Sequence, residues 1–171
     1  MKSIPNRIPC VFIMLSFLLL SCEKKEHRNP LIDYSAKNEL LFVETMQKHL
    51  NAVSNKDLKT LKSTLSPKGN MQLILPKTEI TNTVADFIAY HKAWFASKTP
   101  WTFETKILNT EIGTDFGIAI TEIIYREPER NGKPYFNRMH VSYALQKIDN
   151  TWYIIKDHAS SIEKSTDLKQ E

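Results

Sequence analysis

The last two predicted strands, residues 138 to 160, constrain the fold more than any other stretch. Residues 139–147 (MHVSYALQK) alternate between two sets of side chains, the period-two pattern of a half-buried strand. Residues 152–160 (WYIIKDHAS) are rich in the aromatic and β-branched residues that strands prefer. Asp149 and Asn150 between them suit the positive φ angles of a two-residue turn. The sequence therefore predicts an antiparallel hairpin here.

The length of this turn decides which side chains face the interior. A two-residue turn places Leu145 opposite Ile154. Continued without interruption, this register puts His158 and Lys156 on the apolar face and Asp157 on the polar face. A turn one residue longer would reverse these assignments, because a one-residue slip moves every side chain to the other face.

Three predicted helices precede most of the strands. Apolar residues recur at helical spacing over residues 35–53, and a short second helix with buried leucines follows Asp57. Residues 71–75 form a short strand, and Thr83-Val-Ala-Asp86 is a capping box that opens a third helix ending before Pro100. Four strands follow, at residues 101–112, 116–126, 135–147 and 151–160.

This order of elements predicts one α+β domain over residues 34–162, with a polar tail over residues 163–171. A strongly curved antiparallel sheet that wraps around the helices would form a cone with an internal pocket.

The final strand also carries a family resemblance. A charged turn, then Trp152-Tyr-Ile154 and, two residues later, Asp157-His158-Ala-Ser160 resemble the closing strand of the nuclear transport factor 2-like superfamily. The match is best for its SnoaL-like branch, which includes polyketide cyclase, ketosteroid isomerase and scytalone dehydratase relatives. The resemblance covers roughly residues 35 to 162 and implies a cystatin-like α+β barrel. It also implies a homodimer through the outer sheet face, with apolar contributions from Ala144, Ile155 and Ile123.

The N-terminus carries an export signal. Lys2 and Arg7 precede the apolar run VFIMLSFLLL, which is shorter than the roughly 20 residues of a spanning helix. The run ends in Leu19-Leu20-Ser21-Cys22, which looks like a bacterial lipoprotein box. We therefore predict a signal peptide over residues 1–21 and a lipid on Cys22 that anchors the protein in the cell envelope. Glu23 after the cysteine fits the outer membrane. The alternative is an ordinary cleaved signal with an incidental cysteine.

Composition restricts the partners of the mature chain. Residues 22–33 are charged and predict a flexible tether. Removing residues 1–21 takes Lys2 and Arg7 from the 23 basic residues, leaving 21 against 19 acidic ones. This balance argues against nucleic acid as a partner. The sequence has no glycine-rich phosphate loop, metal-ligand spacing or nucleophile elbow, so we expect no metal and no cofactor.

A second hairpin turn, Asn131-Gly132, places Glu122 opposite Val141. Together the two hairpins predict one apolar face, made of Phe116, Ile118, Ile120, Ile124, Met139, Val141, Leu145 and Ile154. Four groups interrupt that face: Glu122, Tyr143, Lys156 and His158. His91, in the middle of the apolar stripe of the third helix, would face the same interior.

This interior cluster is the candidate site. In the functional interpretation Glu122 accepts a proton, with His158 or Tyr143 as the donor. The predicted ligand contacts are His91, Trp94, Lys156 and Met139. In the structural interpretation the same groups form a satisfied network in the core.

Three function classes remain open from the sequence. The first is an envelope lipoprotein that binds a small apolar or amphipathic ligand in its cone. The second is a cofactor-independent isomerase or lyase of the SnoaL or ketosteroid isomerase type that uses Glu122 and His158. The third is a protein-interaction adapter. A dry, filled interior would favour the adapter, and an open interior would favour a ligand or chemistry.

The anchor can be tested by replacing Cys22 with serine, which removes the sulfur that would carry the lipid. We expect the Cys22→Ser protein to leave the membrane fraction, whereas the wild type sediments with the envelope. Fractionation followed by immunoblotting measures this. An ordinary cleaved signal would give the same soluble fraction for both proteins.

Overall fold

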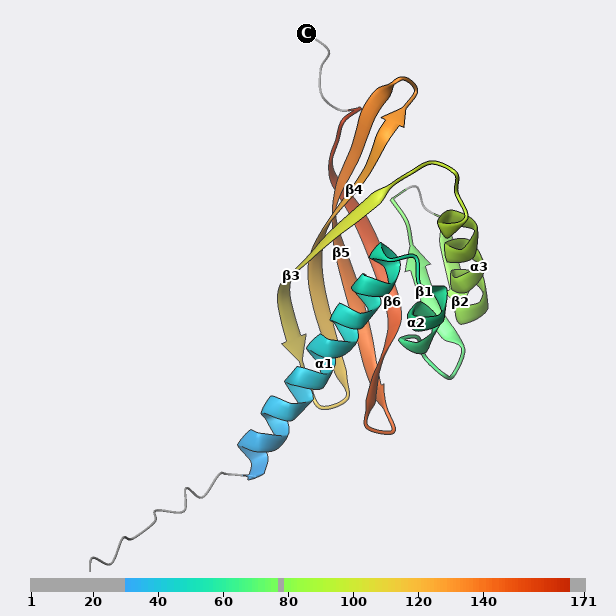
Figure 1. The fold of residues 1–171 in the computed structure, drawn as a ribbon. Helices are drawn as coiled ribbons and strands as arrows, with labels where there is room; N and C mark the ends of the chain where they lie inside the picture. The colour runs from blue at the N-terminus through green and yellow to red at the C-terminus, as the bar shows by residue number, and fades with distance from the viewer. Residues whose placement is uncertain (1–29, 77–78, 167–171) are drawn as a thin grey trace, which may run out of the picture.

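The structure is a computed structural model that describes residues 30–76 and 79–166. These residues form three helices and six strands (Figure 1). The helices are α1 (Pro30–Ser54), α2 (Leu58–Ser63) and α3 (Val84–Phe95). The strands are β1 (Asn70–Ile74), β2 (Ile80–Thr83), β3 (Thr102–Ile112), β4 (Phe116–Arg130), β5 (Lys133–Ile148) and β6 (Thr151–Lys164). The predicted signal peptide, Cys22 and most of the tether lie outside the described residues.

The six strands form one curved sheet in the order β2-β1-β6-β5-β4-β3. Strands β3 to β6 are the predicted antiparallel meander, and the α+β prediction is confirmed. The short strand β2, which the sequence did not suggest, pairs with β1, and β1 runs parallel to β6. The helix α1 begins at Pro30, inside the stretch predicted as tether. None of the helices within residues 30–76 and 79–166 has the length and apolar character needed to cross a membrane.

Local signals in the sequence fix the starts of two helices as predicted. The carboxylate of Asp57 accepts a hydrogen bond from the Thr60 amide and caps α2. The hydroxyl of Thr83 accepts one from the Asp86 amide at 3.1 Å and donates one to the Asp86 carboxylate, so the capping box opens α3. Satisfied amides at both starts stabilise helices that are short.

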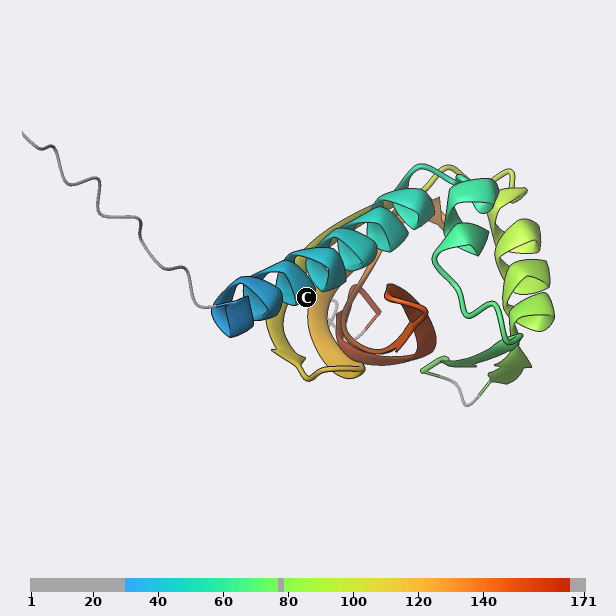
Figure 2. The same cartoon turned by 90° about the horizontal axis from the view of Figure 1, so that it is seen from below.

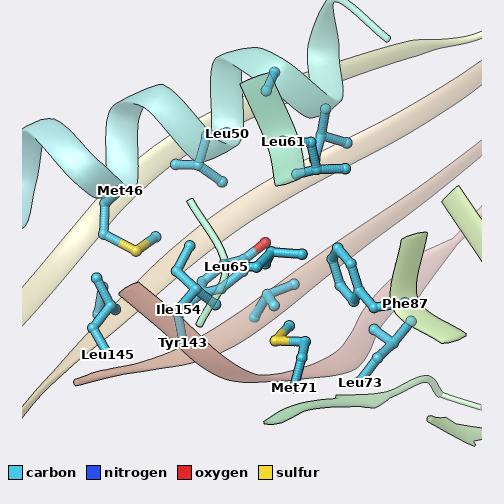
Figure 3. Packing of buried hydrophobic residues seen from close by; sticks show 14 of the residues in the cluster. Met46, Leu50, Leu61, Leu65, Met71, Leu73, Phe87, Tyr143, Leu145 and Ile154 are labelled. Carbon is cyan, nitrogen blue, oxygen red and sulfur yellow. The ribbon is translucent and has the colours of Figure 1, made fainter. Parts of the chain in front are cut away.

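The helix α1 packs across the concave side of the sheet, while α2 and α3 lie together near β1 and β2 (Figure 2). Met46 and Leu50 of α1 point toward Leu145 and Ile154, and all four side chains are almost fully buried (Figure 3). At about 25 cal/mol per Å² of apolar surface, such burial is the main stabilising term of the fold. The core continues from these residues to Leu61 of α2, Met71 of β1 and Phe87 of α3 (Figure 3).

Polar contacts hold the same helix against the sheet at both of its ends. The Asn38 amide donates to the Gly113 carbonyl at 2.9 Å, and the Asn38 side-chain oxygen accepts from Lys147 Nζ at 2.8 Å. At the other end of α1 the Ser54 hydroxyl donates to the Phe103 carbonyl at 2.7 Å. The position of α1 over the sheet is thus fixed at two points far apart along the helix.

A β-bulge in β6 changes which of its side chains face inward. The turn residues Asp149 and Asn150 have φ angles of 48° and 62°, and Leu145 pairs with Ile154 as predicted. Beyond that pair one extra residue, Ile155, shifts the ladder, so that Tyr143 pairs with Asp157. An extra residue in one strand reverses the alternation that follows. The prediction that His158 and Lys156 face the interior and Asp157 the outside is therefore wrong.

A second bulge, in β4, has the same effect on the neighbouring hairpin. Arg130 pairs with Lys133 across the predicted Asn131-Gly132 turn, but the ladder shifts by one residue between Glu127 and Arg130. Glu122 consequently pairs with His140 rather than with Val141 and lies on the outer face. Pro128 lies within this bulge, where a residue without an amide hydrogen is tolerated.

The two shifts also divide the predicted apolar face. Val141, Leu145 and Ile154 are buried inside, and Met139 lies on the same face, whereas Phe116, Ile118, Ile120 and Ile124 lie outside. Ile123, expected on the outer face, is fully buried.

Candidate ligand cavity

A cavity of about 620 Å³ lies between the concave face of the sheet and the helices α1 and α3. Its lining comes from α1, α3 and strands β1, β3, β4, β5 and β6. This volume is within the range of small-molecule sites in proteins. Aromatic and aliphatic side chains and polar groups contribute to the wall in similar measure.

Four of the seven predicted site residues line this cavity: His91, Trp94, Met139 and Tyr143. His91 and Trp94 come from α3, and Met139 and Tyr143 from the inner face of β5. The structure thus brings together the helix and strand groups that the sequence assigned to one interior.

The other three predicted site residues lie on the outer face of the sheet. Glu122 accepts a hydrogen bond from Arg138 Nη1 at 3.2 Å, and Lys156 and His158 are exposed. The two bulges put them there. The predicted pairing of Glu122 with His158 across one cavity is therefore wrong, and neither can reach a molecule bound inside.

Asp157 faces the interior, where the predicted register placed its neighbours Lys156 and His158. Its side chain is 5% exposed and lines the cavity, and its Oδ1 has no hydrogen-bond partner among the described residues. Burial raises the pKa of this carboxyl well above its usual range, because the charged form loses its hydration. The uncharged acid can both donate and accept a hydrogen bond.

His91 presents a neutral imidazole to the same cavity. Its Nδ1 lies 2.9 Å from the Phe87 carbonyl oxygen, and since a carbonyl can only accept, Nδ1 carries the proton. Burial lowers the pKa of His91 to about 4. The remaining polar atom of the ring, Nε2, is then a hydrogen-bond acceptor.

His49 on α1 has the same arrangement. Its Nδ1 lies 2.7 Å from the Thr64 hydroxyl oxygen, which itself donates to the Leu61 carbonyl at 2.7 Å. The imidazole must therefore donate to Thr64, which leaves Nε2 as an acceptor. Burial, and secondarily His91, lower the pKa of His49 to about 3. Its ring lies edge-on to Tyr143, with centroids 5.5 Å apart.

Tyr143 stands between these groups on the sheet. It pairs with Asp157 across the β5–β6 ladder, and both are almost fully buried. Burial, and secondarily Asp157, raise the pKa of the Tyr143 phenol well above its ordinary value. The phenol is therefore a hydrogen-bond donor at neutral pH.

The opposite end of the cavity is charged. The Glu127 carboxylate forms a short ion pair with Arg130 and accepts a hydrogen bond from the Tyr125 hydroxyl at 2.5 Å. The Arg130 guanidinium also lies 3.4 Å from the centre of the Tyr135 ring. The contact with Arg130 lowers the pKa of Glu127, and burial raises the pKa of Tyr125 to about 12. This cluster orders the rim formed by the β4–β5 hairpin.

Two further polar groups line the wall near that end. The side-chain oxygens of Asn137 on β5 and Ser161 on β6 are buried and have no hydrogen-bond partner among the described residues. With Asp157 they make three such groups on one wall. Native interiors seldom leave buried polar atoms unpaired, so these atoms are available to a bound molecule or to water.

Sequence reasoning missed Asp157, His49 and the rim cluster. His49 lies on the buried stripe of α1 with Met46 and Leu50, and this helical spacing could have identified it. Pro128 could have indicated the bulge that moves Glu122 outward. The residues around Ile155 carry no comparable signal for the bulge in β6.

The groups on the cavity wall can donate and accept hydrogen bonds. The cavity offers an uncharged acid, a phenol and two imidazole acceptors in a desolvated space. Across residues 30–76 and 79–166, no group of three or more His, Cys, Asp or Glu side chains could hold a metal ion.

A conical α+β fold with such an interior pocket defines the nuclear transport factor 2-like (NTF2-like) class. The model of the SnoaL-like domain matches residues 43–163, and the chain belongs to this family. A comparison with curated proteins finds no match.

Solved structures show the same fold at low sequence identity. A candidate dehydratase of the NTF2-like family from Streptomyces avermitilis is 12% identical, with a TM-score of 0.65 over 75% of this chain and 99% of that one. A ketosteroid isomerase-like protein from Erwinia carotovora atroseptica is 13% identical, with a TM-score of 0.62 over 72% and 95%. An NTF2-like protein from Cytophaga hutchinsonii is 18% identical, with a TM-score of 0.59 over 72% and 98%.

The two buried imidazoles make stability depend on pH. Because their pKa values, about 3 and about 4, lie below the ordinary 6.5, the unfolded chain takes up protons that the folded chain does not. We therefore expect the free energy of unfolding to fall as pH drops from about 6.5 to 4, by up to about 1.4 kcal/mol per pH unit for each imidazole. Urea unfolding at several pH values measures this slope.

The variant His91→Gln should lower the acid slope by up to about 1.4 kcal/mol per pH unit, because one of the two imidazoles no longer titrates. His140, exposed on the outer face, supplies the control His140→Gln, which should keep the wild-type slope. Asp157 acts in the opposite sense. Its raised pKa contributes stability at low pH that is lost as pH rises. An unchanged slope in His91→Gln would contradict the assignment.

Proposed function

We propose that this protein binds a small, largely apolar molecule in the cavity between its sheet and its helices. The observation that carries the proposal is Asp157, a carboxyl group that is 5% exposed and whose Oδ1, on the cavity wall, has no partner within residues 30–76 and 79–166. An unpaired buried polar group costs about 1–3 kcal/mol, and a core without a ligand function would gain by replacing it. A protein adapter needs neither this group nor the open interior.

We further propose that the predicted export signal directs this binding protein to the cell envelope, where Cys22 would anchor it. The ligand would then be a molecule present at the membrane or in the space around it, which fits the apolar lining. The fold and the family support the presence of a pocket, and the cellular setting rests on residues 1–23 of the sequence.

A second candidate function is cofactor-independent proton transfer of the isomerase or lyase type. Its support is the placement of Asp157 opposite Tyr143, with the two neutral imidazoles in the same cavity. A carboxyl with a raised pKa can give or take a proton near neutral pH, and a phenol can stabilise developing negative charge. In this mechanism Asp157 and Tyr143 replace the pair Glu122 and His158. The ketosteroid isomerase-like and dehydratase-named proteins of the same fold make this chemistry worth testing.

Filling the cavity should abolish binding. Ala159 lies on the cavity wall, so the variant Ala159→Phe would occupy the space of a ligand. We expect the uncharged fluorescent probe N-phenyl-1-naphthylamine to bind the wild type, and to bind Ala159→Phe at least about tenfold more weakly. A fluorescence titration measures the difference.

The neighbouring residue provides the matched control. Ser160 is exposed on the other side of the same strand, so Ser160→Phe adds an equal ring outside the cavity and should keep wild-type binding. Thermal unfolding of both variants checks that they are folded. Equal probe binding by a folded Ala159→Phe protein would overturn the proposal.

The variant Asp157→Asn separates the two candidate functions. It keeps the shape and the hydrogen-bonding capacity of the side chain but cannot exchange a proton. A binding protein should retain its ligand in this variant, whereas an enzyme should keep binding and lose turnover. Glu122→Gln on the outer face should change neither property.

We also propose that the outer sheet face pairs with a second copy of the chain. Phe116 and Ile118 on β4 are 57% and 50% exposed, and Leu108 on the neighbouring strand β3 is 43% exposed. Exposed apolar surface of this kind can mark an interaction site.

Replacing Ile118 with aspartate should weaken such a dimer, because a charge would be buried in the interface. Light scattering at tens of micromolar should give a dimer for the wild type and a monomer for Ile118→Asp. The control Leu40→Asp adds the same charge at an exposed apolar residue of α1, on the other side of the sheet, and should leave the dimer intact. A monomeric wild type would contradict this proposal without affecting the cavity.

A further inference from the structure

The polar atoms on the cavity wall are arranged along one direction. Asp157 and Ser161 lie four residues apart on the inner face of β6, and the β5–β6 ladder is regular between them. At 3.2–3.4 Å per residue this separation is about 13 Å. Asn137 lies beyond Met139, the residue that pairs with Ser161, so it belongs to the same end of the cavity as Ser161.

Between the two ends the wall is apolar. Ala159 of β6, Val141 and Met139 of β5 and Ile123 of β4 cover the interval between Asp157 and Ser161. The cavity therefore has a hydrogen-bonding group at one end, an apolar stretch, and a second pair of hydrogen-bonding groups at the other end.

Charge distinguishes the two ends. Of the described residues that line the cavity, the basic side chains other than the two imidazoles are Arg130 and Lys164. Arg130 is bound by Glu127 at the rim, and Lys164 lies seven residues along β6 from Asp157. An anion beside Asp157 would lose its hydration and meet a carboxyl group and two neutral imidazoles. The Asp157 end thus disfavours negative charge.

We infer that the cavity takes an elongated molecule that is uncharged at its Asp157 end, whose apolar body lies along β5 and β6 and which carries a hydrogen-bonding group at each end. One end contacts Asp157, and the other contacts Asn137 and Ser161. This inference rests on the proposed binding function and adds the chemical class of the ligand. Hydroxyl, ketone and amide groups fit both ends, because a carboxylic acid, a carboxamide and a hydroxyl can each donate and accept.

Three rigid probes of the same skeleton test the class. The probe 4,4′-dihydroxystilbene carries a hydroxyl at each end of an apolar body, 4-hydroxystilbene carries one, and stilbene-4,4′-dicarboxylate places an anion at both ends. One extra hydrogen bond corresponds to about a tenfold difference in affinity. We expect the dihydroxy probe to bind about tenfold more tightly than the monohydroxy probe, and the dicarboxylate more weakly than either. Competition with N-phenyl-1-naphthylamine measures all three.

Two variants assign the ends. In Asp157→Leu, which removes the hydrogen bonds at one end, the advantage of the dihydroxy probe over the monohydroxy probe should disappear. In Ser161→Ala it should shrink. Thermal unfolding checks that Asp157→Leu is folded. Ser160→Ala on the outer face should bind all three probes as the wild type does.

The outcomes separate this inference from the function on which it rests. If no probe binds, or if Ala159→Phe binds them unchanged, the cavity is not the binding site and the proposed function fails. If the probes bind and Ala159→Phe blocks them, but the dicarboxylate binds as tightly as the dihydroxy probe, only the ligand class is wrong. Equal affinities of the dihydroxy and monohydroxy probes in the wild type would overturn it as well.

Discussion

The extra residue Ile155 in β6 determines which side chains this part of the strand presents to the interior. Before Ile155 the inward side chains are Trp152 and Ile154, which belong to the core against α1. After it they are Asp157, Ala159 and Ser161, which line the cavity. The bulge therefore divides one strand into a part that supports the fold and a part that forms the site. A bulge also bends its strand, and this bend contributes to the curvature that separates the sheet from the helices.

The site depends on that division because a buried carboxyl is costly. Placed among the packed side chains of the core, Asp157 would need a partner for each of its oxygens. Beside the cavity it can remain uncharged, and it can obtain hydrogen bonds from a ligand or from water. The imidazoles of His49 and His91 remain neutral for the same reason, and each is fixed by a hydrogen bond through Nδ1. The Asp157 end of the cavity is thus polar without being charged.

The contrast between sequence and structure follows from what a period-two pattern can reveal. The pattern and the turn residues are sufficient for the fold, since both hairpins form with the turns predicted at Asp149-Asn150 and Asn131-Gly132. They are also sufficient to predict that Tyr143 and His91 face the interior. The predicted inner face of β5 lines the cavity, and the predicted apolar stripe of α3 is buried. Glu122, Lys156 and His158 lie beyond a bulge from their turns. A register counted from a turn is valid only as far as the first bulge. Because a bulge depends on the curvature of the whole sheet, a period-two pattern in one strand does not reveal it.

The outer face shows the other consequence of the same shifts. Phe116, Ile118, Ile120 and Ile124 alternate regularly on β4, and their apolar character made them resemble a core-facing row. The structure instead buries the alternate residues of β4, most of which have small side chains: Gly117, Ala119, Thr121 and Ile123. Gly117 is needed because a Cβ there would come within 2.6 Å of the Phe42 ring of α1. A β-strand whose outer row is more apolar than its inner row is unusual for a sheet with one face in water. The inner row is small because α1 packs closely against this end of the sheet, and the outer row is apolar because, in our proposal, a second copy of the chain covers it.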